Sequence, residues 1–87
     1  MKKILMFVME GCPYCANARS YMQELFDEHP EYRDLDIEII DEVQHPDIAD
    51  RYDYYYVPTY YLDGKKFHEG AATREMVADL FQKAYEG

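Results

Sequence analysis

Cys12 and Cys15 are the residues whose type and spacing favour chemistry most clearly, and they are the only cysteines of the chain. Two thiols separated by two residues can cycle between a dithiol and a disulfide. A thiolate is stabilised where a helix begins, because the first N–H groups are unpaired and the helix dipole is positive there. A disulfide between such close cysteines constrains little of the unfolded chain, which disfavours a purely structural role. The pair therefore predicts thiol–disulfide exchange.

Cys12 is the expected attacking thiol, because it lies at the predicted helix start beside Gly11. Cys15 lies one turn deeper, faces the predicted core and is the expected resolving thiol. Attack by Cys12 on a substrate disulfide gives a mixed disulfide, which Cys15 breaks to release the reduced substrate. Pro13 suits the first helical turn, since the N–H that proline lacks would be unpaired there. Tyr14 is expected to be exposed and to pack against a bound peptide or glutathione.

A metal-binding module is the alternative from another functional class. The histidines are His29, His45 and His68, so a zinc or iron–sulfur site with Cys12 and Cys15 would have ligands of suitable type. None of the three histidines has ligand spacing, and His29 and His45 each precede a proline at a predicted element boundary. The sequence therefore favours no bound metal.

Length and charge restrict the class of protein. A chain of 87 residues makes one domain, expected to span residues 1–87. The net charge of -9 opposes binding to nucleic acid or to an anionic membrane and suits brief encounters with a basic patch on another protein. The N-terminal apolar run ends at Met9, no cleavage site for a signal peptide follows, and no segment is long enough to span a bilayer. We expect a monomer in the reducing cytoplasm.

The first half of the chain predicts a strand, a long helix and a second strand. A continuous apolar run predicts a buried strand over residues 3–9, which Gly11 ends. Apolar positions at helical spacing predict a helix from Pro13 to about His29, ended by Pro30, with a stripe that comprises Cys15, Ala18, Met22, Leu25 and His29. Alternation over residues 35–40 predicts the second strand, parallel to the first, with Leu35, Ile37 and Ile39 on one face.

The second half predicts a short helix, a hairpin and a last helix. Residues 47–52 form the short helix, and residues 57–62 form a strand that opens at Pro58. Asp63-Gly64 is a hairpin turn that leads into a strand over residues 65–69. Thr73 is a plausible N-cap for the last helix. The predicted order is βαβαββα, an α/β fold with a four-stranded mixed sheet flanked by helices.

This order, together with three motifs, resembles the thioredoxin superfamily. Cys12-Pro13-Tyr14-Cys15 is similar to the glutaredoxin form of the dithiol, Val57-Pro58-Thr59 to the family's cis-proline loop, and Asp63-Gly64 to its last hairpin. The resemblance covers essentially the whole chain. It implies a thioredoxin-like fold and a thiol–disulfide oxidoreductase that reduces protein or small-molecule disulfides, with no bound cofactor.

The same resemblance implies a substrate-binding edge. In this family the backbone of the residue before the cis proline, here Val57, pairs with an extended substrate near the disulfide. Tyr14, Val57 and Pro58 are thus the expected substrate-binding residues. The expected supporting residues are Gly11, Pro13, Thr59 and Gly70.

The electron donor is expected to be NADPH, through a flavoprotein reductase of the thioredoxin-reductase type. Glutaredoxins that use glutathione usually have a lysine where this chain has Met9, and a Gly-Gly segment where it has residues 68–75, which resemble a thioredoxin ending. The chain lacks tryptophan and a buried aspartate in its first strand, both usual in thioredoxins. The resemblance is therefore to glutaredoxin-like redoxins with a thioredoxin-like body, and a glutathione-dependent glutaredoxin is the alternative.

Tyrosines crowd the segment 52–61, around Pro58. Alternation is expected to send some of them into the core and others to the rim of the active face. Tyrosine supplies large contact area at low entropic cost. We hypothesise that two or three of these tyrosines form an adhesive surface for a protein partner.

Overall fold

Strands and helices alternate along the chain in the computed structural model, which describes residues 1–87. The elements are β1 (Ile4–Val8), α1 (Pro13–Glu28), the 3-10 helix η1 (Pro30–Asp34), β2 (Ile37–Asp41), α2 (Pro46–Ala49), β3 (Thr59–Leu62), β4 (Lys65–Glu69) and α3 (Arg74–Glu86). The predicted order βαβαββα is confirmed. None of the helices combines the length and the apolar character needed to cross a membrane.

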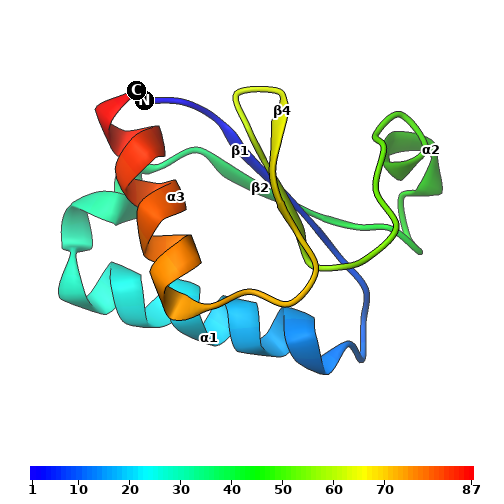
Figure 1. Cartoon of the computed structure of the whole chain (residues 1–87), viewed down its shortest axis with the longest axis horizontal. Coiled ribbons are helices and arrows are strands. Elements are labelled where there is room, and N and C mark those ends of the chain that lie inside the picture. The colour runs from blue at the N-terminus through cyan, green and yellow to red at the C-terminus, as the bar shows by residue number, and fades with distance from the viewer.

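The four strands form one mixed sheet in the order β2-β1-β3-β4 (Figure 1). β1 is parallel to β2 and antiparallel to β3, and β3 is antiparallel to β4. Val8 lies opposite Asp41, and Phe7 lies opposite Thr59. The end of β1 therefore lies beside the start of β3, which brings Cys12 and Pro58 to the same end of the two inner strands of the sheet.

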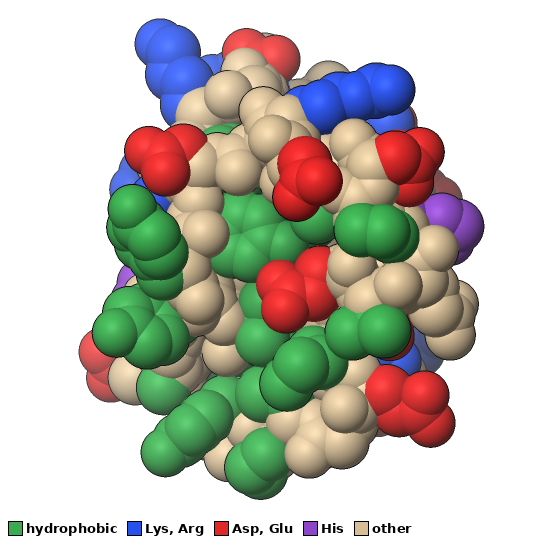
Figure 2. Space-filling view, turned by 90° about the vertical axis from the view of Figure 1, so that its right-hand side faces the viewer, with side chains coloured by type: hydrophobic (Ala, Val, Ile, Leu, Met, Phe, Trp, Pro, Cys, Tyr) green, Lys and Arg blue, Asp and Glu red, His purple; other side chains and the backbone are tan.

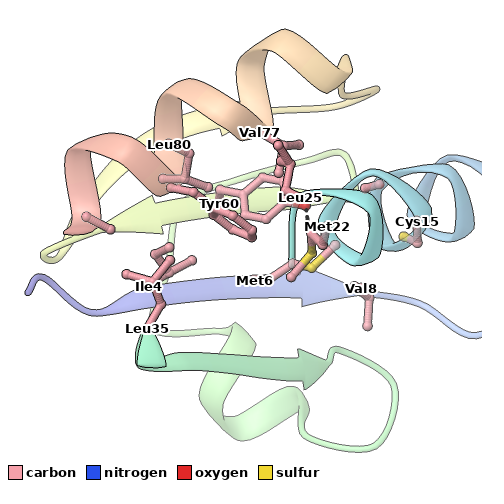
Figure 3. Close-up of a cluster of buried hydrophobic side chains, with 13 residues drawn as sticks. Ile4, Met6, Val8, Cys15, Met22, Leu25, Leu35, Tyr60, Val77 and Leu80 are labelled. Carbon is pink, nitrogen blue, oxygen red and sulfur yellow. Dashed lines mark hydrogen bonds between the residues drawn. The ribbon is translucent and has the colours of Figure 1, made fainter. Parts of the chain in front are cut away.

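The core has two layers because successive side chains of β1 point to opposite faces of the sheet. On one face, Ile4, Met6 and Val8 pack with α1 and α3. Figure 3 shows Tyr60 of β3 lying among the side chains of both helices on this face. On the other face, Phe7 packs with Ile40, Ala49 and Tyr61. Both faces of β1 are covered, as its continuous apolar run predicts.

Two local predictions are confirmed at the turns. Asp63 and Gly64 adopt φ values of 52° and 83°, which place both central residues of the hairpin in the left-handed region. The Thr73 hydroxyl accepts the backbone N–H of Met76 at 3.1 Å and caps α3. Arg74, at the start of α3, donates to Glu24 at 3.0 Å and to Glu28. The last helix is thereby joined to α1.

Several predicted boundaries are wrong. Helix α1 ends at Glu28, so His29 is not part of its buried stripe and is exposed. The structure inserts η1 after Pro30, and the predicted strand over residues 35–40 begins two residues later and ends at Asp41. Ile39, which alternation places on one face with Leu35 and Ile37, is 42% exposed because β2 is an edge strand of the sheet.

The other two shifts concern α2 and β3. The short helix covers Pro46–Ala49 rather than residues 47–52. β3 begins at Thr59 rather than at Val57. Proline has no N–H to donate to a strand ladder, so Pro58 precedes the paired residues instead of opening them.

Candidate active site

Cys12 lies at the junction of the β1–α1 turn and the helix. It is the N-cap of α1, with extended φ and ψ of -83° and 114°, and Pro13 follows it in the first turn. The turn itself depends on Gly11, whose φ of 81° favours glycine, and on a hydrogen bond of 3.2 Å from the Cys12 N–H to the Met9 carbonyl. The Cys12 thiol is partly exposed at the surface, as expected of an attacking group.

Cys15 lies on the inner side of α1 and is only 4% exposed. It belongs to the same buried cluster as Val8, Ala18 and Met22, at the end of that cluster nearest the active site (Figure 3). Both cysteines are free thiols. The two sulfur atoms therefore occupy different environments, although they are separated by a single helical turn.

These environments move the two pKa values in opposite directions. Burial raises the pKa of the Cys15 thiol to about 11, although a backbone hydrogen bond at Met9 opposes the rise. For Cys12, desolvation also raises the pKa, but it is outweighed by hydrogen bonds from the Cys15 thiol and from the backbone at Cys15 and Tyr14. The net pKa of Cys12 is lowered. Cys12 therefore loses its proton at a lower pH than an ordinary cysteine, and Cys15 keeps its proton to a higher pH.

The loop before β3 lies against Cys12. The Val57–Pro58 peptide bond is cis, as predicted. The Cys12 thiol points toward the Val57 carbonyl oxygen, with 3.9 Å between the sulfur and the oxygen. Behind it, the Gly70 N–H donates to the Pro58 carbonyl at 2.9 Å, and the Thr59 hydroxyl donates to the Tyr56 carbonyl. Gly70 (φ 94°) and Thr59 thus support this loop by direct contact.

Glu69 is a residue of this loop's environment that sequence reasoning missed. Its carboxylate accepts the backbone N–H groups of Tyr55 at 2.6 Å and of Tyr56 at 3.0 Å. Lys66 donates to the other carboxylate oxygen at 2.8 Å. The Lys66 hydrogen bond and the two backbone N–H groups hold the pKa of Glu69 down at about 2. The segment before Val57 is therefore tied to β4 by a carboxylate that stays ionised.

Comparison with known proteins agrees with this geometry. The family model described as a thioredoxin domain matches residues 2–82. The thioredoxin of Methanocaldococcus jannaschii is 30% identical over 81 residues, which are 93% of each chain. The chain belongs to the thioredoxin family. It is accordingly a thiol–disulfide oxidoreductase, and Cys12 and Cys15 are its redox-active pair.

Solved structures of thioredoxins share the fold at low sequence identity. The oxidised thioredoxin of Plasmodium falciparum superposes with a TM-score of 0.71 at 18% identity, covering 94% of this chain and 79% of that one. Oxidised thioredoxin O1 of Arabidopsis thaliana gives 0.73 at 19% identity, covering 98% and 78%. At these identities the likeness shows the architecture alone, which is the thioredoxin-like sheet and helices described above.

The tyrosines of this thioredoxin-family protein divide between the core and the surface. Tyr60 and Tyr61 are buried on opposite faces of β3, with 0% and 6% of their surface exposed. Tyr14, Tyr55 and Tyr56 are 56%, 86% and 70% exposed. The predicted exposure of Tyr14 and the predicted division of the tyrosine-rich segment are thus confirmed. A role for the exposed rings in docking stays a prediction.

An open pocket of about 420 Å³ borders both cysteines of the thioredoxin pair. Its lining includes Arg19, Asp41 and Gln44, which the sequence did not single out. Arg19 is close enough to Cys15 to lower its pKa, although burial dominates. No group of three or more His, Cys, Asp or Glu side chains is arranged to hold a metal ion.

Proposed function

We propose that Cys12 is the attacking thiolate and Cys15 the resolving thiol of the exchange cycle. The observation that supports this assignment is the contrast between a partly exposed Cys12 with a lowered pKa and a buried Cys15 with a raised one. The Cys12 thiolate forms a bond to one sulfur of the substrate disulfide, and the other sulfur leaves as a thiolate, which then takes up a proton. Cys15, on losing its proton, then attacks Cys12, so the second substrate thiol is released and the Cys12–Cys15 disulfide remains.

Substrate binding is proposed for Tyr14, Val57 and Pro58. The Val57 carbonyl lies beside the Cys12 sulfur, in a loop held by Gly70 and Glu69. Pro58 is buried and Val57 is half-buried, so the proposed contact with an extended chain is made by the backbone of Val57, through main-chain hydrogen bonds. The exposed ring of Tyr14 offers apolar contact on the helix side. The proposed substrate is an extended protein segment around a disulfide, and small disulfides fit the same site.

The proposed electron donor is NADPH, through a flavoprotein reductase of the thioredoxin-reductase type. Membership of the thioredoxin family supports this donor, as do Met9 and the thioredoxin-like segment around Gly70. The Pro-Tyr pair inside the dithiol motif favours glutathione instead, as in a glutaredoxin. We further propose that residues 1–87 act as one domain, as a monomer in the cytoplasm.

Two assays run in parallel test these proposals. Insulin reduction is followed with thioredoxin reductase and NADPH, and separately with glutathione, glutathione reductase and NADPH. We expect turnover in the first system. Turnover in the second system alone would replace the proposed donor by glutathione. Absence of turnover in both, together with bound zinc or iron, would favour the metal module.

A cysteine variant tests the mechanism separately from the donor. Cys12→Ser is expected to abolish turnover in whichever system is active, because the attacking sulfur is gone. Full activity of this variant would refute the assignment of Cys12.

A further inference from the structure

A second open pocket, of about 430 Å³, lies between the loop after β2, helix α2 and the tyrosine-rich segment. Its lining combines three aromatic rings with two carboxylates: Tyr52, Tyr54, Tyr55, Glu42 and Asp50. The dithiol chemistry described above does not use these side chains. The pocket lies next to the active site, because Tyr55 precedes Val57 by two residues and the Glu42 N–H donates at 2.9 Å to the carbonyl of Val8, which lines the pocket at the two cysteines.

The walls of this pocket are held in place by packing. The rings of Tyr52 and Tyr54 lie against the buried Phe7, with centroid distances of 5.0 Å and 4.9 Å. The Tyr54 hydroxyl donates to Glu42 at 2.9 Å, which fixes one carboxylate at the rim. The backbone of Tyr55 is anchored by Glu69, while its ring is 86% exposed. The side chains of Tyr52, Tyr54 and Glu42 are thus oriented before a ligand arrives, which lowers the cost of binding.

The charge of the pocket is not neutralised from within the chain. Neither Glu42 nor Asp50 is a partner in any ion pair of the structure. Figure 2 shows the face that includes α2 and the start of α1: hydrophobic and acidic side chains are interspersed across it, and the basic ones lie mostly toward its margins. Aromatic faces and carboxylates both attract a cation, through the ring quadrupole and through charge. An anionic ligand would be repelled.

We propose that this pocket binds an arginine or lysine side chain of the disulfide-containing protein partner, a few residues from the disulfide. The inference rests on the proposed function, because the disulfide at Cys12 places the neighbouring residues of the partner over the loop 52–57. Residues of an extended chain advance about 3.3 Å each, so a small range of spacings brings a basic side chain to the pocket. The pocket thereby selects among disulfides of otherwise equal reactivity.

The test uses synthetic peptides with one cysteine linked as a disulfide to 5-thio-2-nitrobenzoate. A single arginine is placed one to four residues before or after the cysteine, and matched peptides contain citrulline or norleucine there. Peptide is mixed with an excess of pre-reduced protein, and release of thionitrobenzoate is followed in a single turnover, so no recycling reductase is needed. At one spacing or more, arginine is expected to raise the second-order rate constant about three- to tenfold over citrulline at low salt.

Variants distinguish the pocket from the overall negative charge. Tyr55→Ala and Asp50→Asn should each reduce the arginine-to-citrulline ratio, whereas Tyr55→Phe should retain it because the ring face remains. Tyr56→Ala removes a similarly exposed ring outside the pocket, and Glu31→Gln removes one exposed charge far from it. Both should retain the ratio.

The outcomes separate this inference from the proposed function. Equal rates for arginine and citrulline at every spacing, or a ratio unchanged in Tyr55→Ala and Asp50→Asn, would overturn the pocket assignment and leave the exchange activity intact. A preference for norleucine over both would assign the pocket to an apolar side chain and overturn it as well. If wild type and Cys12→Ser release thionitrobenzoate from every peptide equally slowly, it is the exchange function that fails.

Discussion

At the scale of single residues, one turn of helix α1 separates two thiols of opposite character. Cys12 occupies the N-cap position of the helix, where the neighbouring Cys15 thiol and the N–H groups of Tyr14 and Cys15 lower the pKa of its thiol. Cys15 lies in the buried cluster below it, where burial favours the neutral thiol. A thiolate that attacks first and a thiol that waits in its protonated form are what a directed exchange cycle requires.

The lowered pKa of Cys12 predicts selective alkylation. With limiting iodoacetamide, the rate at Cys12 should rise with pH to a midpoint below that of the cysteine in an unstructured reference peptide. Cys15 should stay unmodified until the pH approaches about 11. Mass spectrometry of peptides after timed quenching measures both rates. Equal alkylation of both cysteines at neutral pH, in a protein shown to be folded, would contradict the assignment.

At the scale of elements, the loop before β3 is held by β4 through Glu69. The hairpin Asp63-Gly64 could be predicted from turn residues, but this link could not. The pairing of β4 with β3 jumps from Lys66 to His68, so one extra residue lies between them. Because of that bulge, the side chains of Lys66 and Glu69 lie on the same face of β4, whereas in a regular strand they would point to opposite faces. A bulge has no reliable mark in a single sequence, so the role of Glu69 could not be predicted from the sequence.

The depressed pKa of Glu69 predicts a pH-dependent contribution to stability. The folded-state pKa is about 2, against about 4.3 when unfolded. A carboxylate of this kind contributes stability above its unfolded pKa and loses it as pH falls through the folded value. The free energy of unfolding of the wild type should therefore fall more steeply between about pH 5 and pH 2 than that of Glu69→Gln. Urea titrations at several pH values measure the free energy of unfolding, and Asp34→Asn is the control. Parallel curves of unfolding free energy against pH for wild type and Glu69→Gln would refute the prediction.

The N-cap of α3 was predictable from local chemistry and gives a second prediction at this scale. Thr73→Ala removes the acceptor for the Met76 N–H and should cost about 1 kcal/mol of unfolding free energy. Thr73→Ser retains the hydroxyl and should cost clearly less. Chemical denaturation at neutral pH compares the variants. Equal destabilisation by alanine and serine would show that the cap contributes little.

At the scale of the whole molecule, the surface of this small protein has an excess of negatively charged side chains. The net charge is -9, while the ion pairs of the structure lie at the surface. Exposed ion pairs contribute about 0.2–1 kcal/mol each and are screened by salt. Long-range repulsion among the unpaired carboxylates opposes folding and is screened as well.

Repulsion is expected to dominate, so sodium chloride should raise the thermal midpoint. At about 10 mM salt the Debye length is about 30 Å, which is comparable with the longest dimension of the molecule, 32 Å. At about 150 mM salt it is about 8 Å, so repulsion across the molecule is screened. The variant Glu31→Gln/Asp34→Asn, with two fewer negative charges, should have a higher midpoint at low salt and a smaller rise. Scanning calorimetry measures both. A midpoint that falls with salt would show that the ion pairs dominate instead.

The element order of the whole molecule and the reactive pair could be predicted from the sequence. The continuous apolar run of β1, the helical spacing of apolar residues in α1 and α3, and the motifs around Cys12 and Pro58 were enough to predict the element order and the chemical pair. The position of β2 at the edge of the sheet, which exposes Ile39, depends on tertiary pairing that periodicity does not encode. The pocket near Tyr55 depends on the packing of a loop around Phe7, so it could not be predicted from the sequence either.

Trapping of the mixed disulfide tests the central assignment most directly. Cys15→Ser protein, fully reduced, is incubated with insulin, quenched with acid and mapped by non-reducing mass spectrometry. We predict a covalent adduct through Cys12 that accumulates because no resolving thiol is present, and no comparable adduct in Cys12→Ser. An adduct through Cys15 in Cys12→Ser, formed as fast as the one through Cys12, would contradict the account.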